Sequence, residues 1–153
     1  MKQLTLFKNT KPKAHGGTLN PSKRKQQRPL ATQKPIHLVL KCHKEMSLFK
    51  EFETVKYYIN RYTWKFHIQV YHLSIQQDHI HLLIKIEDRN SYNKFIKSLT
   101  GMLARLYGKG LWKLSPFTRV VSWGRDYKSV KRYVDLNEDE IWGVKPYQVR
   151  HQK

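Results

Sequence analysis

Cysteine, acidic residues and long apolar runs are all scarce in this sequence. Cys42 is the one cysteine among 153 residues, so the chain forms no internal disulfide, and a reducing cytoplasmic location fits this usage best. No apolar stretch approaches the roughly 20 residues that cross a bilayer. The N-terminal residues lack the apolar segment and cleavage site of a secretory signal. We therefore expect no membrane segment and no export.

The shortage of acidic residues leaves a strong positive charge. The chain has 30 Lys and Arg against 11 Asp and Glu, a formal net charge of +19. Such a charge attracts polyanions and repels basic partners, so nucleic acid is the first candidate partner. A basic ribosomal protein or a membrane-surface protein can show the same balance. Charge alone therefore indicates a class of partner and no activity.

Length and composition predict one compact domain with a basic segment at each end. Residues 1–35 contain no acidic residue and are rich in Lys, Arg, Gln, Pro and Gly, which is typical of a flexible arm. Lys23, Arg24 and Lys25 would contact phosphates if this arm settles on nucleic acid, and a solubilising tail is the alternative. We place the domain at residues 36–142 and a basic tail at residues 143–153.

Hydrophobic periodicity predicts the order strand, helix, strand, strand, helix, strand, helix. A change of alternation near Tyr71 predicts a β-bulge, and residues 76–78 are few enough for a hairpin turn. Without its last helix this order is the ferredoxin-like split β-α-β arrangement. We expect an α+β fold with an antiparallel sheet, helices on one face and a further C-terminal helix. The predicted strands are 36–43, 64–75, 79–86 and 118–123. The predicted helices are 48–62, a segment from a cap at Asn90 or Ser91 to Gly108, and 126–140 with Asp126 as its cap.

Two histidines interrupt the apolar segment QQDHIHLLIKIE, residues 76–87. On a strand, the alternate isoleucine and leucine side chains from residue 80 to 86 would face the core, so His79 and His81 would leave it together. Imidazoles in this arrangement are close enough to share a divalent cation. Two polar residues on a solvated sheet face are the alternative.

Tyr133 and Asn137 lie four residues apart in the last predicted helix. Their phenol and carboxamide therefore project from one stripe of that helix. A nucleophile and an oxygen ligand for a metal would thus be carried by the same element.

These motifs resemble the HUH-type single-tyrosine transposases of single-stranded DNA, in particular the REP-associated branch. The resemblance spans about residues 34–138 and rests on FHIQVYHLSIQQDHIHLLIKI, NKFIKSLTGMLARLYGKG, TRVV and the helix with tyrosine and then asparagine. It implies that His79 and His81 are metal ligands, Tyr133 the nucleophile on a C-terminal catalytic-tyrosine helix, and Asn137 the third protein ligand. The implied cofactor is Mg²⁺ or Mn²⁺.

The resemblance also implies an activity and a partner. It indicates an endonuclease and strand transferase that forms a 5′-phosphotyrosine intermediate on hairpin-forming single-stranded DNA, in the cytoplasm or on the nucleoid, as a monomer or homodimer. Arg119 is a candidate for positioning DNA, with an exposed strand charge as the alternative. Lys131 and Arg132 are candidates for contacting DNA and for favouring the tyrosine phenolate.

Two other functions stay open at this point. A host-adopted nucleic-acid binding protein could keep the fold and charge without cleaving, and a basic ribonucleoprotein component could carry His79 and His81 as surface residues. The last predicted helix runs into LNEDEIWG, where the REP-associated branch commonly ends in asparagine and proline. This departure would suit a divergent or repurposed member.

Overall fold

The sheet has five antiparallel strands in the order β1-β5-β2-β4-β3. The structure, a computed structural model, describes residues 13–19, 26–43 and 46–147. The strands are β1 (Ala14–His15), β2 (Ile36–Lys41), β3 (Gln69–Ile75), β4 (His79–Lys85) and β5 (Phe117–Val120). The helices are the 3₁₀ turn η1 (Leu48–Glu51), α1 (Phe52–Lys65), α2 (Arg89–Tyr107) and α3 (Arg125–Ile141).

Strands β3 and β4 form the predicted hairpin, and the register of β3 shifts between Val70 and His72. The bulge expected at Tyr71 is therefore present. The start of this strand was predicted wrongly, because Trp64 and Lys65 belong to the end of α1 and β3 begins only at Gln69. Aromatic residues favour strands, but here the apolar stripe of α1 continues through Tyr62, which is buried.

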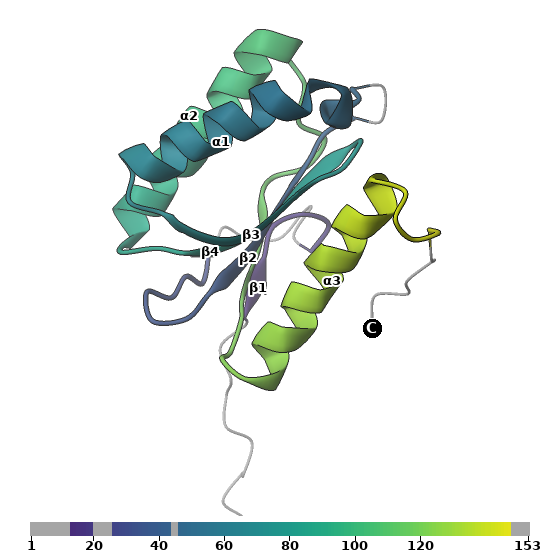
Figure 1. Cartoon of the computed structure of the whole chain (residues 1–153). Coiled ribbons are helices and arrows are strands. Elements are labelled where there is room, and N and C mark those ends of the chain that lie inside the picture. The colour runs from purple at the N-terminus through teal and green to yellow at the C-terminus, as the bar shows by residue number, and fades with distance from the viewer. Residues whose placement is uncertain (1–12, 20–25, 44–45, 148–153) are drawn as a thin grey trace, which may run out of the picture.

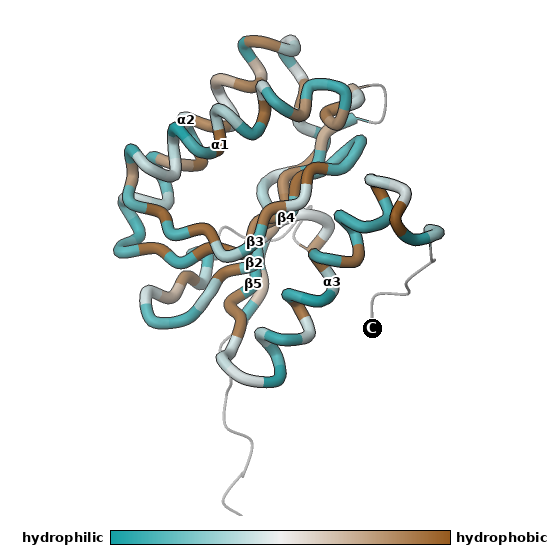
Figure 2. Tube along the Cα trace, viewed as in Figure 1, coloured by the Kyte–Doolittle hydropathy of each residue, from teal (hydrophilic) through white to brown (hydrophobic). Residues whose placement is uncertain are grey.

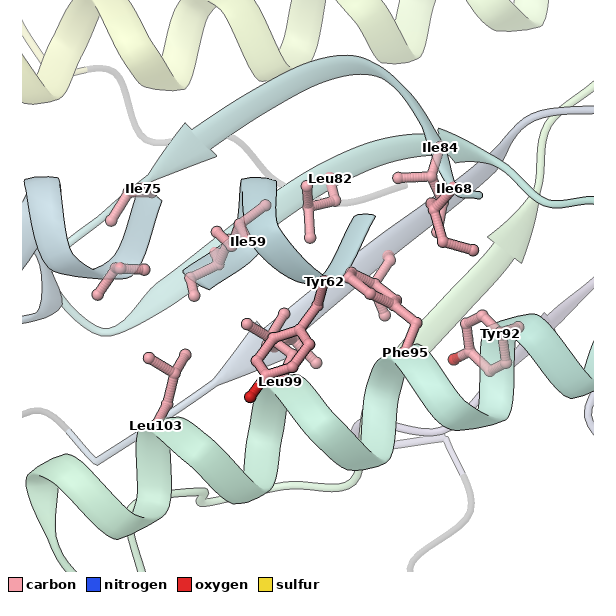
Figure 3. Close-up of a cluster of buried hydrophobic side chains, with 14 of the residues drawn as sticks. Ile59, Tyr62, Ile68, Ile75, Leu82, Ile84, Tyr92, Phe95, Leu99 and Leu103 are labelled. Carbon is pink, nitrogen blue, oxygen red and sulfur yellow. The ribbon is translucent and has the colours of Figure 1, made fainter. Parts of the chain in front are cut away.

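Helices α1 and α2 cover one face of the sheet, and α3 covers the other (Figure 1). The larger core lies between the sheet and the first two helices. In Figure 3, Phe95 and Leu99 point from α2 toward Leu82 of the sheet and Ile59 of α1. The predicted α+β class is thus confirmed, with α3 as the additional C-terminal helix.

A smaller apolar cluster holds α3 against the sheet. Leu83 of β4, Val121 after β5 and Val130 of α3 are buried together, with Tyr71 and Tyr127 packed beside them. Figure 2 shows hydrophobic positions gathered along the strands in the middle of the molecule, and α3 with polar and apolar positions interleaved. The central strands are consequently covered on both faces.

The helix ends differ in detail from the predicted caps. The side chain of Asp88, and not that of Asn90 or Ser91, caps α2 by accepting a hydrogen bond from the Ser91 N–H. Gly108 ends that helix as predicted. Asp126 lies inside the first turn of α3, where its carboxylate accepts bonds from Arg119 and from the Ser122 N–H. No helix in the described ranges is long and apolar enough to cross a membrane.

The structure differs from the predicted flexible arm at residues 13–19 and 26–35. Ala14 and His15 pair with β5 as an edge strand. The Arg28 guanidinium donates to the Pro116 carbonyl at 2.7 Å and to the Thr118 hydroxyl at 2.8 Å. Composition alone does not predict this order, because backbone pairing and the bonds of Arg28 hold these residues without a large buried apolar surface. Lys23, Arg24 and Lys25 lie outside the described residues.

We predict that Leu83→Ala lowers the free energy of unfolding by about 2–5 kcal/mol, because it leaves a cavity under α3. Leu106→Ala is the matched control, since Leu106 is 46% exposed at the end of α2 and its loss should change stability by about 0.5 kcal/mol or less. Urea unfolding followed by circular dichroism measures both. Equal effects of the two substitutions would contradict the packing described for α3.

Candidate active site

His79 and His81 project from β4 toward α3. Their ring centroids are 4.6 Å apart at an interplanar angle of 86°. His81 is buried, at 3% exposure, whereas His79 is half-buried. Neither lies on an open, solvated sheet face, because α3 covers this side of the strand.

Tyr133 and Asn137 reach the same region from α3. The Tyr133 ring meets the His81 ring edge to face, with centroids 5.4 Å apart. Gln76, in the hairpin turn before His79, donates from Nε2 to the Asn137 carbonyl at 2.8 Å. Because Val130 and Val134 are buried on the sheet side of α3, the helix can present its tyrosine and asparagine only along this edge. The four residues singled out in the sequence therefore converge.

Asp78 is the charged partner of His79. Its Oδ1 lies 2.6 Å from His79 Nδ1, and its Oδ2 lies 4.0 Å from the Lys41 ammonium. Burial acts to raise the pKa of Asp78, but the hydrogen bond and charge of His79, together with Lys41, outweigh burial and leave this pKa lowered. Asp78 therefore stays ionised and orients the His79 ring. The sequence signal is the adjacency of Asp78 to His79, although the pattern at residues 76–78 indicates only a turn.

His37 is a further site residue, which the sequence did not distinguish from the other histidines on predicted strands. Its Nε2 lies 3.1 Å from His81 Nδ1, and the two rings are stacked with centroids 5.3 Å apart. It also meets the Tyr133 ring at 6.2 Å. Burial, aided by the positive charge of Arg119, lowers the pKa of His37 to about 4. A neutral His37 thus fixes the orientation of His81.

The donors fit a divalent cation if Asn137 contributes. The Asn137 Nδ2 donates to the Tyr133 carbonyl at 2.8 Å, so the carboxamide oxygen is the end suited to a cation. The Asp78 contact at His79 Nδ1 is the outer partner that metal-bound histidines usually have, and it directs Nε2 toward ligation. Within the described ranges, no group of three or more His, Cys, Asp and Glu side chains could hold a metal ion. Substrate oxygens would have to complete the coordination.

Two hollows open beside these side chains. One of about 400 Å³ is lined by the hairpin turn, His79, Tyr133, Asn137 and Glu140. The other, of about 350 Å³, lies on the β2 side and shares His79 and Tyr133 with the first. Tyr133 therefore lies between the two hollows. An extended ligand that occupies both hollows would pass over its side chain.

The predicted basic contacts are placed unequally. Arg119 forms an ion pair with Asp126 at 2.5 Å and so ties β5 to the first turn of α3. Lys131 lies 3.5 Å from Asp135, which also contacts His72 of β3 at 3.0 Å. Arg132 is exposed on the helix. A DNA contact for any of the three stays a prediction.

Comparison with known proteins defines the class first. The fold is that of the tyrosine transposases: the structure of a REP-associated tyrosine transposase bound to a REP hairpin superposes with a TM-score of 0.62 at 11% identity, covering 75% of this chain and 72% of that one. A candidate transposase from Deinococcus radiodurans R1 gives 0.51 at 18% identity, covering 75% and 98% of the two chains. At such identities the likeness establishes the fold alone. No curated protein matches the chain.

The family follows from the sequence match. Residues 31–141 match the family described as IS200-like transposase. Because the match covers well over half of the chain, this protein belongs to the IS200-like transposase family. The resemblance inferred from the sequence is therefore confirmed.

We predict that His37 makes stability fall as the pH is lowered from about 6.5 to about 4. The unfolded histidine binds its proton near pH 6.5, but the folded one does so only near pH 4. Between these values the unfolded state therefore binds more protons than the folded state, and the free energy of unfolding falls as the pH falls. The slope for one such proton is up to about 1.4 kcal/mol per pH unit. His37→Gln, which can still place a hydrogen-bonding group near His81, should remove that contribution. Urea unfolding in EDTA across this range measures it, and identical slopes in both proteins would contradict a neutral His37.

Proposed function

We propose that this transposase-family protein is a metal-dependent endonuclease and strand transferase for single-stranded DNA. The observation that carries the proposal is the contact of the Tyr133 ring with His81, 5.4 Å between centroids, beside a hollow that His79 and Asn137 also line. A nucleophile, two imidazoles and a carboxamide thus surround one space where a phosphate could bind. In this proposal Tyr133 is the catalytic residue.

Tyr133 Oη would attack the phosphorus of the DNA backbone. A bond forms between Oη and phosphorus, the bond from phosphorus to the 3′-oxygen breaks, and that oxygen takes up a proton while the phenol gives one up. The products are a 5′-phosphotyrosine link and a free 3′-hydroxyl. Because the phosphodiester bond is exchanged and not hydrolysed, a second 3′-hydroxyl can reverse the step and join another strand without ATP.

His79, His81 and Asn137 would hold Mg²⁺ or Mn²⁺ in this site. Bound there, the cation would stabilise negative charge on a non-bridging phosphate oxygen as phosphorus is attacked. Asp78 and His37 would fix the two imidazoles, since each lies against the Nδ1 atom of one of them. The hydrogen bond from Gln76 to the Asn137 carbonyl would hold α3, and with it Tyr133, beside these ligands.

The proposed substrate is hairpin-bearing single-stranded DNA. The net charge of +19 supports a polyanionic ligand, and the REP hairpin carried by the superposed transposase supports a folded strand. Arg132, exposed on the helix that carries Tyr133, is our candidate for a phosphate contact close to the site. Lys131, already near Asp135, is a weaker one.

We predict a covalent adduct between the protein and end-labelled single-stranded DNA hairpins from its own genomic flanks, formed in Mn²⁺ or Mg²⁺ and seen on a denaturing gel. Tyr133→Phe should reduce it by at least about 10³-fold, as loss of a nucleophile does. Tyr127→Phe is the matched control, because Tyr127 lies on the same helix within the apolar cluster and should leave the adduct intact.

An adduct that persists in Tyr133→Phe would refute the assignment of the nucleophile. Tight binding of all the flanking hairpins without any adduct would refute the proposed activity, and would favour the adopted binding protein instead.

We predict that Mn²⁺ binds at one site and that His79→Ala lowers its affinity by at least about 10-fold. Loss of a residue that only orients a ligand typically lowers metal affinity by about 10–100-fold, and loss of the imidazole ligand itself should cost at least as much. The control is His67→Asn, since His67 is exposed with φ of 54°, a conformation that asparagine tolerates. Isothermal titration calorimetry in the presence of a non-cleavable oligonucleotide measures both. Unchanged affinity in His79→Ala would place the cation elsewhere.

A further inference from the structure

The turn at Gly16–Leu19 forms one wall of the second hollow. Gly17, Thr18 and Leu19 line this space together with His79, His81 and Tyr133. The turn lies before residue 31, where the match to the IS200-like family begins. It thus reaches the proposed active site from outside the family-matched segment.

The turn is fixed in place by backbone contacts. The Gly17 N–H donates to the Ser115 carbonyl at 3.1 Å, and the Val120 N–H donates to the Lys13 carbonyl at 2.8 Å. Arg28 adds bonds from its guanidinium to the carbonyls of His15 and Pro116. A wall held at this many points is ordered before any ligand arrives, so a ligand would not have to order it.

Gly16 is required by this arrangement. Its φ is +84°, and a Cβ added there would lie 2.0 Å from the Pro116 carbonyl oxygen. Any side chain at this position would push the turn away from the strand β5 that supports it. Gly17 is less constrained but also tightly packed, since its Cβ would lie 3.2 Å from the Phe117 Cβ. The backbone of the turn therefore packs directly on the floor of the hollow.

The lining of the hollow is apolar on one side and polar on the other. The apolar part comes from Leu19, Val39, Leu114 and Phe117, and the polar part includes Lys41 and the two histidines beside Tyr133. Leu19 is 46% exposed, so its side chain is accessible to a ligand that enters the hollow. An apolar side that includes the Phe117 ring, next to the Lys41 ammonium, matches the two chemical parts of a nucleotide, the base and its phosphate.

We propose that this hollow is a subsite for one unpaired base of the strand that Tyr133 cleaves, and that the turn at Gly16–Leu19 determines which base it accepts. The inference rests on the proposed function, because the base is placed by its link to the phosphate at Tyr133. A volume of about 350 Å³ is near the lower end for small-ligand sites, which is sufficient for one base.

The direct test is an NMR titration of the full chain with the four deoxynucleoside 5′-monophosphates, with inorganic phosphate at the same ionic strength as the reference. We expect at least one nucleotide to shift the amide signals of Gly17, Thr18, Leu19 and Phe117 saturably, whereas phosphate does not. Shifts equal to those with phosphate, or none for any nucleotide up to high millimolar concentration, would overturn the subsite.

Two substitutions with matched controls test the wall itself. Leu19→Ala should lower the affinity for the preferred nucleotide by about 3- to 10-fold. Its control is Leu106→Ala, because both leucines are 46% exposed. Gly16→Ala should displace the turn and abolish the nucleotide-induced shifts. Its control is Gly101→Ala, whose Cβ would meet nothing within 4 Å. Since Leu19 is on the surface, its substitution tests the subsite even if Gly16→Ala fails to fold. Equal affinity in Leu19→Ala and Leu106→Ala would refute the role of the turn.

The adduct assay separates this inference from the proposed function. A protein that forms the Tyr133 adduct but binds nucleotides equally well with and without Leu19 would retain the function and refute the subsite. A protein whose nucleotide shifts depend on Leu19 but that forms no adduct with any hairpin would retain the subsite and refute the function.

Discussion

Strand β4 is buried on both faces, and the arrangement of the molecule depends on how those faces are filled. Toward α1 and α2 it presents only aliphatic side chains. Toward α3 it presents Leu83 together with two histidines, and polar rings at such a depth need hydrogen-bonding partners. His37 and Asp78 supply them. The contact of Leu83 with Val130 then sets how closely the tyrosine helix can approach the rings.

Much of this could be predicted from local patterns, and the exceptions have a common cause. Alternation and turn length were enough for the hairpin, its bulge and the placing of His79 and His81 on one face. The role of His37 could not be seen, because it depends on the pairing of β2 with β4, which sets Val39 opposite His81 and brings His37 within reach of it. The structure at residues 13–19 and 26–30 was missed for the same reason: it comes from contacts with residues about 90 positions away, such as that of Arg28 with Thr118.

Three acidic side chains on this side of the sheet link one element to another or orient a histidine. Asp126 links β5 to the start of α3, and Asp135 links the middle of that helix to His72 of β3. Asp78 orients a histidine in the turn between β3 and β4. Carboxylates engaged in this way hold the helix on the sheet while their charge is offset by a neighbouring cation. The remaining excess of lysine and arginine is then available to a polyanion.

The bulge at Tyr71 has a consequence for how the gene can change. One residue more stands on β3 than on the facing part of β4, so that His72 and not Tyr71 lies opposite Leu83. Loss of a single codon here would give a regular ladder, and gain of one would enlarge an existing irregularity. Strand β2 pairs with the other edge of β4, so the register between β2 and the strand that carries the histidines does not depend on the length of β3. The hairpin thus contains a position where the length of β3 can change without shifting the pairing of β2 with β4, while the contacts of Tyr71 and His72 with α3 limit such a change.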